Sequence, residues 1–404
     1  MVTGDAVAVS FTGIQCCCRG NHRVHRFLLP FIVFIETSRL LIRSGLPEVI
    51  VFHDQLSAMK SNGEGRDSMV RIEMFPQQDD RYQIFLQLRD KIMPGQPRME
   101  ILPETLCLLA WQDEHCLARA SVTIVDDFRS VEGSVGIIGH YEATDPNAGT
   151  ELLRIAQKRL TSRGAEHVIG PMNGNIWMPY RFALPRGVRD TDYQPAFFLG
   201  EPQNSMSYPQ QWEAVGFIPT HTYQSRIFTQ LHQQSLPAQR IGDRAVKGGV
   251  TFTSFQMDRY NMQLQAIFDL TAISFEKYPY FKAIQYHEFR EQMEPLRDIL
   301  DPELILLAWY EDVLVGFLFA YPDMLSVTAG SPKRVVAKTI ATASSVSSLE
   351  LTAPLVDKIH QVAYEKGYES VIHALSYDNN ESLLAMRHFD TDLFRRYALY
   401  EWRP

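Results

Sequence analysis

Three side chains near the C-terminal end of the sequence are of types that exchange protons: His373, Tyr377 and Tyr397. A histidine titrates close to neutral pH and can act as a base, whereas a tyrosine hydroxyl can give a proton to a leaving group. Each residue also has an ordinary structural explanation, since tyrosines pack at the rims of cores and buried histidines bond to their neighbours. The three residues are therefore candidates for acid–base chemistry, with both explanations open.

The five cysteines predict neither a disulfide framework nor a zinc site. Cys16, Cys17 and Cys18 are consecutive, Cys107 and Cys116 lie in apolar strand-like segments, and no CxxC pair is present. Free thiols are typical of a reducing compartment. The sequence therefore predicts a cytoplasmic protein with no bound metal.

Charge and hydropathy argue against two classes of partner. The net charge is −8, whereas a protein that binds nucleic acid carries a basic surface. The most apolar stretch, residues 27–35, contains Pro30 and is shorter than the roughly 18 residues that a membrane-spanning helix needs. We therefore expect a protein that binds neither nucleic acid nor membrane.

An internal repeat organises the elements that must position these residues. Two sequence patterns occur twice in the same order, at offsets of 198 and 203 residues: 103–111 with 302–309, and 163–170 with 366–373. The five-residue difference fits within a loop. A repeat of this length predicts two copies of one structural unit.

The apolar patterns in both copies predict the same order of elements. This order is a strand, one or two helices, a hairpin, a further strand, and a helix that ends at glycine before a short buried strand. The later helices are expected over 150–163 and 349–366, where Gly164 and Gly367 suit left-handed C-caps. The fold class is therefore α/β with a mixed sheet, in two tandem domains. The expected boundaries are 1–68 for a poorly ordered N-terminal extension, 69–229 for the first domain, 230–249 for a linker and 250–404 for the second domain.

This order of elements resembles the GNAT superfamily of acyl-CoA N-acyltransferases, and the repeat resembles its tandem members. The resemblance spans residues 69–404 and rests on segments 133–145, 170–173, 201–204 and 212–217 in the first copy, and 314–323, 371–375, 378–382 and 394–400 in the second. It implies two GNAT-like domains, each with a sheet that splays at its centre. It also implies acyl transfer, acetyl first, from CoA to a small-molecule or peptide amine.

In that family the pantetheine arm of CoA enters the splayed sheet, and the pyrophosphate binds at a helix N-terminus through a glycine-rich loop. Both copies depart from this loop, because 145–150 has one glycine and 347–352 has none. The second copy is the better candidate for acetyl-CoA, with Lys333 or Lys338 as a source of positive charge. The cofactor-binding residues that the resemblance implies are Thr339, Ile340, Ala341, Ser347, Ser348, Leu349, Glu350, Leu351, Thr352 and Asn380.

The resemblance further implies roles for the proton-exchanging residues. Tyr397 is the first candidate for the acid that protonates the leaving sulfur, Tyr377 is the second, and His373 is a candidate base. Asn380 either lies near the pantetheine arm or caps the following helix. In the first copy, Glu142 belongs either to the substrate cleft or to the framework.

The aromatic residues of the first copy have two interpretations. Trp177, Tyr180, Trp212 and Tyr223 form either an aromatic wall over a substrate cleft or part of a core. Two alternative functions also remain. A non-catalytic protein that binds a ligand or partner is favoured by the acidic residues in both loops, whereas aminoacyl transfer from a charged RNA is disfavoured by the net acidity.

Overall fold

The computed structural model describes residues 69–93, 101–128, 131–185, 196–297, 300–328, 330–379 and 381–403. The predictions for residues 1–68, which include the consecutive cysteines, and for Asn380 lie outside the described residues.

The elements of the first copy follow one another as β1 (Arg71–Pro76), α1 (Tyr82–Ile92), β2 (Leu106–Gln112), β3 (His115–Val125), β4 (Val135–Ala143), α2 (Pro146–Thr161), β5 (His167–Gly170), β6 (Phe182–Ala183), α3 (Tyr208–Glu213) and β7 (Ile218–Phe228). The second copy begins with α4 (Leu236–Lys247), β8 (Val250–Ser254), α5 (Tyr260–Phe275), α6 (Tyr286–Met293), β9 (Ile305–Tyr310) and β10 (Val313–Pro322). It continues with β11 (Val327–Thr328), β12 (Ser331–Pro332), β13 (Arg334–Thr342), the 3₁₀ segment η5 (Ser344–Leu349), α7 (Thr352–Glu365), β14 (Ser370–Tyr377), α8 (Glu381–Met386) and β15 (Asp392–Trp402).

The repeat predicted from the sequence is confirmed by the order of these elements. In each copy an antiparallel hairpin, β2–β3 or β9–β10, leads to a parallel pair joined through a helix, β4–β5 or β13–β14. The crossover helices α2 and α7 are followed by Gly164 and Gly367 at φ values of +95° and +79°, as expected for left-handed caps. The fold is a mixed α/β sheet flanked by helices.

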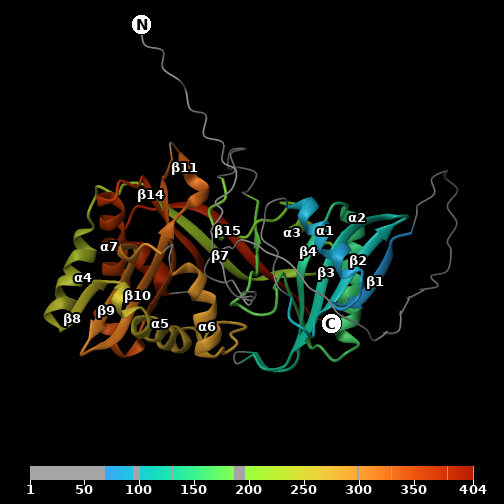
Figure 1. Cartoon of the computed structure of the whole chain (residues 1–404), viewed down its shortest axis with the longest axis horizontal. Coiled ribbons are helices and arrows are strands. Elements are labelled where there is room, and N and C mark those ends of the chain that lie inside the picture. Colours follow the sequence, from blue (N-terminus) through green and yellow to red (C-terminus); the bar gives the residue numbers. More distant parts are fainter. Residues whose placement is uncertain are drawn as a thin grey trace, which may run out of the picture.

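The last strand of each copy pairs with the opposite copy. Within the described residues, thirteen strands form one sheet in the order β1-β2-β3-β4-β5-β15-β7-β14-β13-β10-β9-β8, with β6 beside β15, and β11 and β12 form a separate two-stranded sheet. Strands β7 and β15 therefore cross between the two halves, and the C-terminal end of the chain lies beside the first half (Figure 1). The expected boundaries assign β7 to the first domain and β15 to the second, whereas in the folded sheet each of these strands pairs with strands of the other copy.

The expected linker 230–249 contains a packed helix. Helix α4 buries Ala238, Ile241 and Ala245 in one core cluster with residues of α7. These alanines and the isoleucine follow the 3.6-residue period of an amphipathic helix, and Ser235 caps the start by accepting a hydrogen bond from the Ala238 N–H. The glutamine-, glycine- and charge-rich composition of residues 230–249 is typical of a linker and conceals this helical period.

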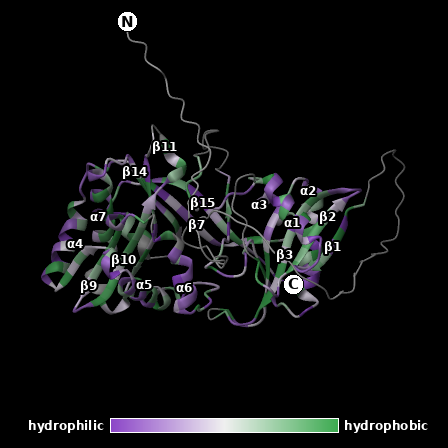
Figure 2. Ribbon diagram, viewed as in Figure 1, coloured by the Kyte–Doolittle hydropathy of each residue, from purple (hydrophilic) through white to green (hydrophobic). Residues whose placement is uncertain are grey.

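The helices cover both faces of the second half of the sheet. Helices α4, α7 and α8 contribute to one hydrophobic core, and α5 and α6 contribute to the other. Hydrophobic residues gather along the inner strands and hydrophilic ones on the outer helices (Figure 2). No helix in the described part of the chain combines the length and apolarity needed to cross a membrane.

Candidate functional site

Strands β13 and β14 pair in parallel over only part of their length. The register runs from Arg334 opposite Ser370 to Ala337 opposite His373, and no β13–β14 pair follows among the described residues. Beyond His373, strand β14 shifts its register against β7, and Leu375 has a φ of +58°. This bulge turns β14 away from β13 and leaves a gap in the sheet.

A cavity of about 310 Å³ passes through this gap. Its lining includes Val356 of α7 and Met386 of α8 on one face of the sheet, and Phe275 and Tyr278 on the other. The cavity continues between the two halves as far as Glu142 of β4. Residues from both copies therefore surround one continuous space.

The structure brings some of the expected site residues into this cavity and leaves others outside it. Thr339, Ile340, His373 and Tyr377 line it. The described residues that are absent from the lining are Ala341, Glu350, Leu351, Thr352 and Tyr397. The predictions for the side chains of Ser347, Ser348 and Leu349 lie outside the described part of the structure. The backbone of residues 344–349 forms η5, ahead of α7.

Tyr397, the first candidate for the acid, lies outside the cavity lining. This residue is fully buried on β15, which is separated from β14 by β7. Its hydroxyl lies 2.5 Å from a carboxylate oxygen of Glu201 and 2.9 Å from the hydroxyl of Ser225. Burial and the neighbouring Glu201 raise the pKa of Tyr397 well above its ordinary value. The residue holds the framework together, because strand exchange places β15 away from the gap.

His373 does not fit the role of a base near neutral pH. Its Nε2 lies 2.8 Å from Nε2 of the buried His360, so one ring donates and the other accepts. Burial, and then the positive charge of Arg226, lowers the pKa of His373 to about 4. Burial also places the pKa of His360 well below its usual range. Both rings are therefore neutral at pH 7.

Tyr377 is the sequence-predicted acid that lies in the cavity. It is partly exposed at the end of β14, and its hydroxyl lies 3.2 Å from Nδ1 of His221. The amide nitrogen of Asn379 donates to the same hydroxyl at 3.4 Å. The structure therefore places Tyr377 in the cavity lining, with its hydroxyl near His221 and Asn379.

The start of α7 offers a poor site for a pyrophosphate. Glu350 is exposed, has a φ of +47° and lies 3.5 Å from Arg244 of α4. Helix α4 also packs close to the first turn of α7, where a Cβ added to Gly242 would lie 3.2 Å from the Cβ of Pro354. A carboxylate and a covering helix thus occupy the position where backbone amides bind phosphate in a glycine-rich loop.

The equivalent helix start in the first half is also occupied. Asp145 caps α2 by accepting the Ala148 N–H at 2.8 Å, and the Tyr208 hydroxyl accepts the Ala143 N–H at 3.0 Å. The adjacent space is filled by an aromatic cluster whose members are Tyr141, Phe182, Tyr208 and Trp212. The β4–β5 pairing also ends early, with Ile137 opposite Ile169. What the described part of the first half lacks is therefore an open helix start for a phosphate, rather than a break in the strand pairing.

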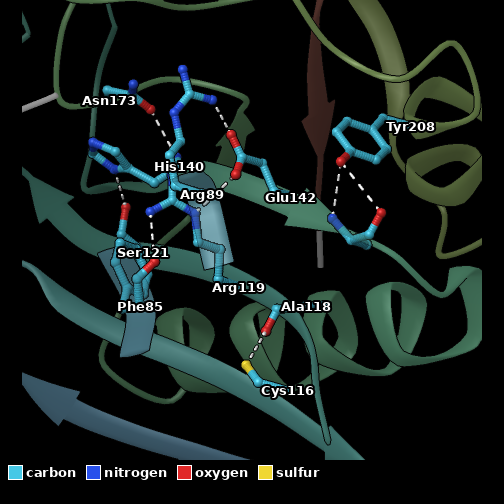
Figure 3. A network of polar contacts seen from close by, with 11 residues as sticks. Phe85, Arg89, Cys116, Ala118, Arg119, Ser121, His140, Glu142, Asn173 and Tyr208 are labelled. Atoms are coloured by element: carbon cyan, nitrogen blue, oxygen red, sulfur yellow. Dashed lines mark hydrogen bonds and ion pairs between the residues drawn. The ribbon is translucent and has the colours of Figure 1, made fainter. Parts of the chain in front are cut away.

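A buried charged network lies in the first half (Figure 3), and three of its members belong to the cavity lining. Glu142 of β4 forms ion pairs with Arg89 of α1 and with Arg119 of β3, the latter at 3.2 Å. Arg119 also donates to the backbone carbonyl of Phe85 at 3.0 Å. Both arginines and Glu142 line the cavity, so Glu142 is at once part of the framework and part of the cleft.

Two further cationic residues, Arg181 and Lys338, line the cavity, and the sequence suggested only the second of them. Arg181, just before β6, stacks between the rings of Tyr180 and Tyr223 at 3.9 and 4.1 Å from their centroids. The ammonium group of Lys338 donates to the Gly200 carbonyl at 3.4 Å. Lys333, the other candidate cation, instead pairs with Glu369 outside the cavity. Arg181 has no sequence signal, because only the folded chain brings it to β13.

The predicted aromatic wall is present in part. Trp177, Tyr180 and Tyr223 line the cavity, whereas Trp212 is fully buried in the core of the first half. The Trp177 indole donates to the Lys282 carbonyl at 2.7 Å, which fixes this side of the wall.

Protein-family models and curated proteins gave no match to the sequence. Similar solved structures include a glucosamine N-acetyltransferase region in a fungal multi-domain β-N-acetylglucosaminidase, with 11% identity and a TM-score of 0.49 over 83% of this chain and 38% of that chain. A GCN5-related N-acetyltransferase from Sphaerobacter thermophilus has 15% identity and a TM-score of 0.45, over 82% of this chain and 96% of that one. A tandem GNAT protein from the clavulanic acid biosynthesis pathway has 12% identity and a TM-score of 0.46, over 82% and 98%.

The present chain spans well under half of the first of these proteins. Each copy has a hairpin, a parallel pair joined through a helix, and a final antiparallel strand, and in the second copy the parallel pair opens into a cavity. The chain has a tandem GNAT-like fold.

Proposed function

We propose that this protein is a CoA-dependent N-acyltransferase that binds acetyl-CoA in its second half and an amine in the central cavity. The observation that carries the proposal is the gap after Ala337 and His373, through which the cavity passes. An unpaired strand edge can bond to an extended chain that carries amides, as pantetheine does. Apolar lining residues such as Ile340, Val356 and Met386 suit its methylene groups.

The pantetheine arm of CoA fits this structure better than its phosphates do. The gap suits the pantetheine arm, whereas Glu350 at the start of α7 would repel a phosphate. Arg244 lies beside Glu350 and becomes available to an anion only when that pair opens. We therefore expect most of the affinity for CoA to come from the arm.

When bound, the acyl-CoA supplies an activated acyl carbon and a thiol leaving group. The protein supplies a largely apolar space between the two halves, in which Tyr377 holds a proton at the end of β14. A donor arm in the gap and an amine in the wider central cavity would meet on one side of the sheet. Holding two reactants together in this way lowers the entropic cost of transfer.

Titration calorimetry with the full chain tests the proposal. Acetyl-CoA and acetyl-pantetheine should bind with dissociation constants within about tenfold of each other, because the arm dominates, and a panel of amines should then stimulate thiol release. The absence of heat with either compound at millimolar concentration, in a protein that melts cooperatively, would reject acyl-CoA binding.

A second candidate function is favoured by the obstructed start of α7. Glu350 and helix α4, which lie at the start of α7, suit a protein that has the cavity but does not bind an acyl donor. Such a protein would bind a small ligand in the cavity without releasing thiol from acetyl-CoA in the presence of any amine. The amine panel therefore separates the two functions.

A further inference from the structure

The cavity lining contains more cationic residues than acidic ones. The cationic residues in the lining are Arg89, Arg119, Arg181 and Lys338, and the acidic ones are Glu142 and Glu201. Glu142 is bound by Arg89 and Arg119 in the first half. This leaves Glu201 as the acid in the lining that could neutralise the central pair, Arg181 and Lys338.

Glu201 is already saturated by other groups. One of its oxygens lies 2.6 Å from Nε of the buried Arg395 and 2.5 Å from the hydroxyl of Tyr397. Its other oxygen accepts the backbone N–H of Phe198 at 3.0 Å. Neither Arg181 nor Lys338 forms an ion pair with any acid in the described part of the chain.

Arg181 is rigidly held, and its hydrogen-bonding capacity is not filled. The rings of Tyr180 and Tyr223 stack against the guanidinium, and one terminal nitrogen donates to the Leu375 carbonyl at 3.3 Å. Its Nε is buried and has no hydrogen-bond partner among the described residues. A guanidinium fixed on aromatic faces remains able to present donors to a planar oxyanion.

Lys338 lies at the point where the gap opens. It directly follows Ala337, the last β13 residue in the parallel register, and its ammonium group contacts one carbonyl, that of Gly200, at 3.4 Å. Burial, and then the charge of Arg181, lowers the pKa of Lys338 to about 7, although the charge of Glu201 acts in the opposite direction. The structure alone therefore stabilises this charge poorly.

We propose that Arg181 and Lys338 together bind an oxyanion, a carboxylate or a phosphate, carried by the molecule that occupies the central cavity. Two partly buried like charges are unfavourable without a counterion, and a ligand oxyanion would compensate both. If the proposed acyltransferase function holds, on which this assignment of substrate class rests, the acceptor is an anionic amine such as an amino acid or an acidic peptide. Its charged group would be anchored beside the acyl donor.

Binding of simple probes to the full chain without CoA tests the proposal independently of transferase activity. The probes are N-acetylglycine, its neutral methylamide and inorganic phosphate, each measured by titration calorimetry. At least one anion should bind at least tenfold more tightly than the methylamide, and the preferred anion identifies the ligand class. Equal affinity for charged and neutral probes, or no binding of either anion, would overturn the proposal.

Variants locate the site. Arg181→Met and Lys338→Met should each weaken binding of the preferred anion at least tenfold, whereas Lys333→Met, a surface lysine paired with Glu369, should leave it unchanged. Lys338→Met should also raise the melting temperature of the ligand-free protein at pH 6, because it removes a partly buried charge that forms no ion pair with the described residues. Wild-type anion affinity in both cavity variants, or a lower melting temperature for Lys338→Met, would show that these cations are already neutralised. If anions bind as expected but no amine releases thiol, the oxyanion site stands and the transferase proposal fails.

Discussion

Ala337 of β13 lies opposite His373 of β14 as the last pair in their parallel register. Two residues further along β14, the backbone N–H of Leu375 donates to the Ser225 hydroxyl at 3.0 Å, and Leu375 takes up a positive φ. Ser225 belongs to β7, which comes from the other copy of the repeat. The strand exchange therefore supplies the contact that holds β14 away from β13.

Filling the gap should abolish binding of the donor. Ser376 lines the cavity just beyond the bulge and is partly exposed, so Ser376→Phe is expected to insert a ring without disturbing the core. We expect at least a tenfold loss of acetyl-CoA affinity by calorimetry. Thr251→Phe adds the same ring to an exposed position on β8 and serves as the control. Unchanged affinity in Ser376→Phe would mean that acetyl-CoA binds elsewhere.

Reversing the charge at the start of α7 should create a better phosphate site. Glu350→Lys removes an exposed pair with Arg244, which contributes little stability, and turns two opposed charges into two cations. Acetyl-CoA should bind several-fold more tightly, whereas acetyl-pantetheine should bind as before. Glu365→Lys, the same change on an exposed residue at the far end of α7, is the matched control. An equal gain in both variants would indicate a general charge effect.

Acid should destabilise the protein through His373. The unfolded chain takes up a proton on this residue near pH 6.5, whereas the folded protein does so only near pH 4, so stability falls as the pH drops through this window. The loss should reach about 3 kcal/mol below pH 4. Urea midpoints between pH 7.5 and 4.5 should depend less on pH in His373→Asn. His115→Asn, at an exposed position, should match the wild type; identical slopes in all three proteins would contradict the assignment.

Tyr397 and Tyr377 should respond differently to loss of the hydroxyl. Tyr397→Phe removes a buried partner of Glu201 and should cost about 1–3 kcal/mol of unfolding free energy, with acetyl-CoA affinity unchanged. Tyr377→Phe should leave stability nearly unchanged and lower turnover on any active amine by about 100-fold, as expected for loss of an acid. Denaturant unfolding and thiol-release assays measure both effects. The reverse pattern would restore Tyr397 as the acid.

The sequence determined the repeat, the order of elements and the fold class. These features can be read from short stretches of sequence without knowledge of the tertiary contacts. They are the two patterns that recur at nearly equal offsets, the glycines at 164 and 367, and the alternating apolar residues. Local composition was also sufficient to indicate that both helix starts lack a glycine-rich loop. Composition alone predicts a linker at 230–249, whereas the structure has helix α4 there. The small apolar residues that helix α4 buries lie at helical spacing among polar ones.

Only the tertiary structure decided which residues share the site. Strand pairing depends on partners that are far away in the sequence. The alternation of apolar and polar residues in β15 does not indicate that this strand pairs with β5 of the first copy. That exchange buried Tyr397 outside the gap and placed Ser225 beside Leu375. It also joined the two halves around one cavity, so that Arg181 and Lys338, 157 positions apart, face the same space. Their juxtaposition comes from the folded sheet, because neither residue carries a local signal of the other.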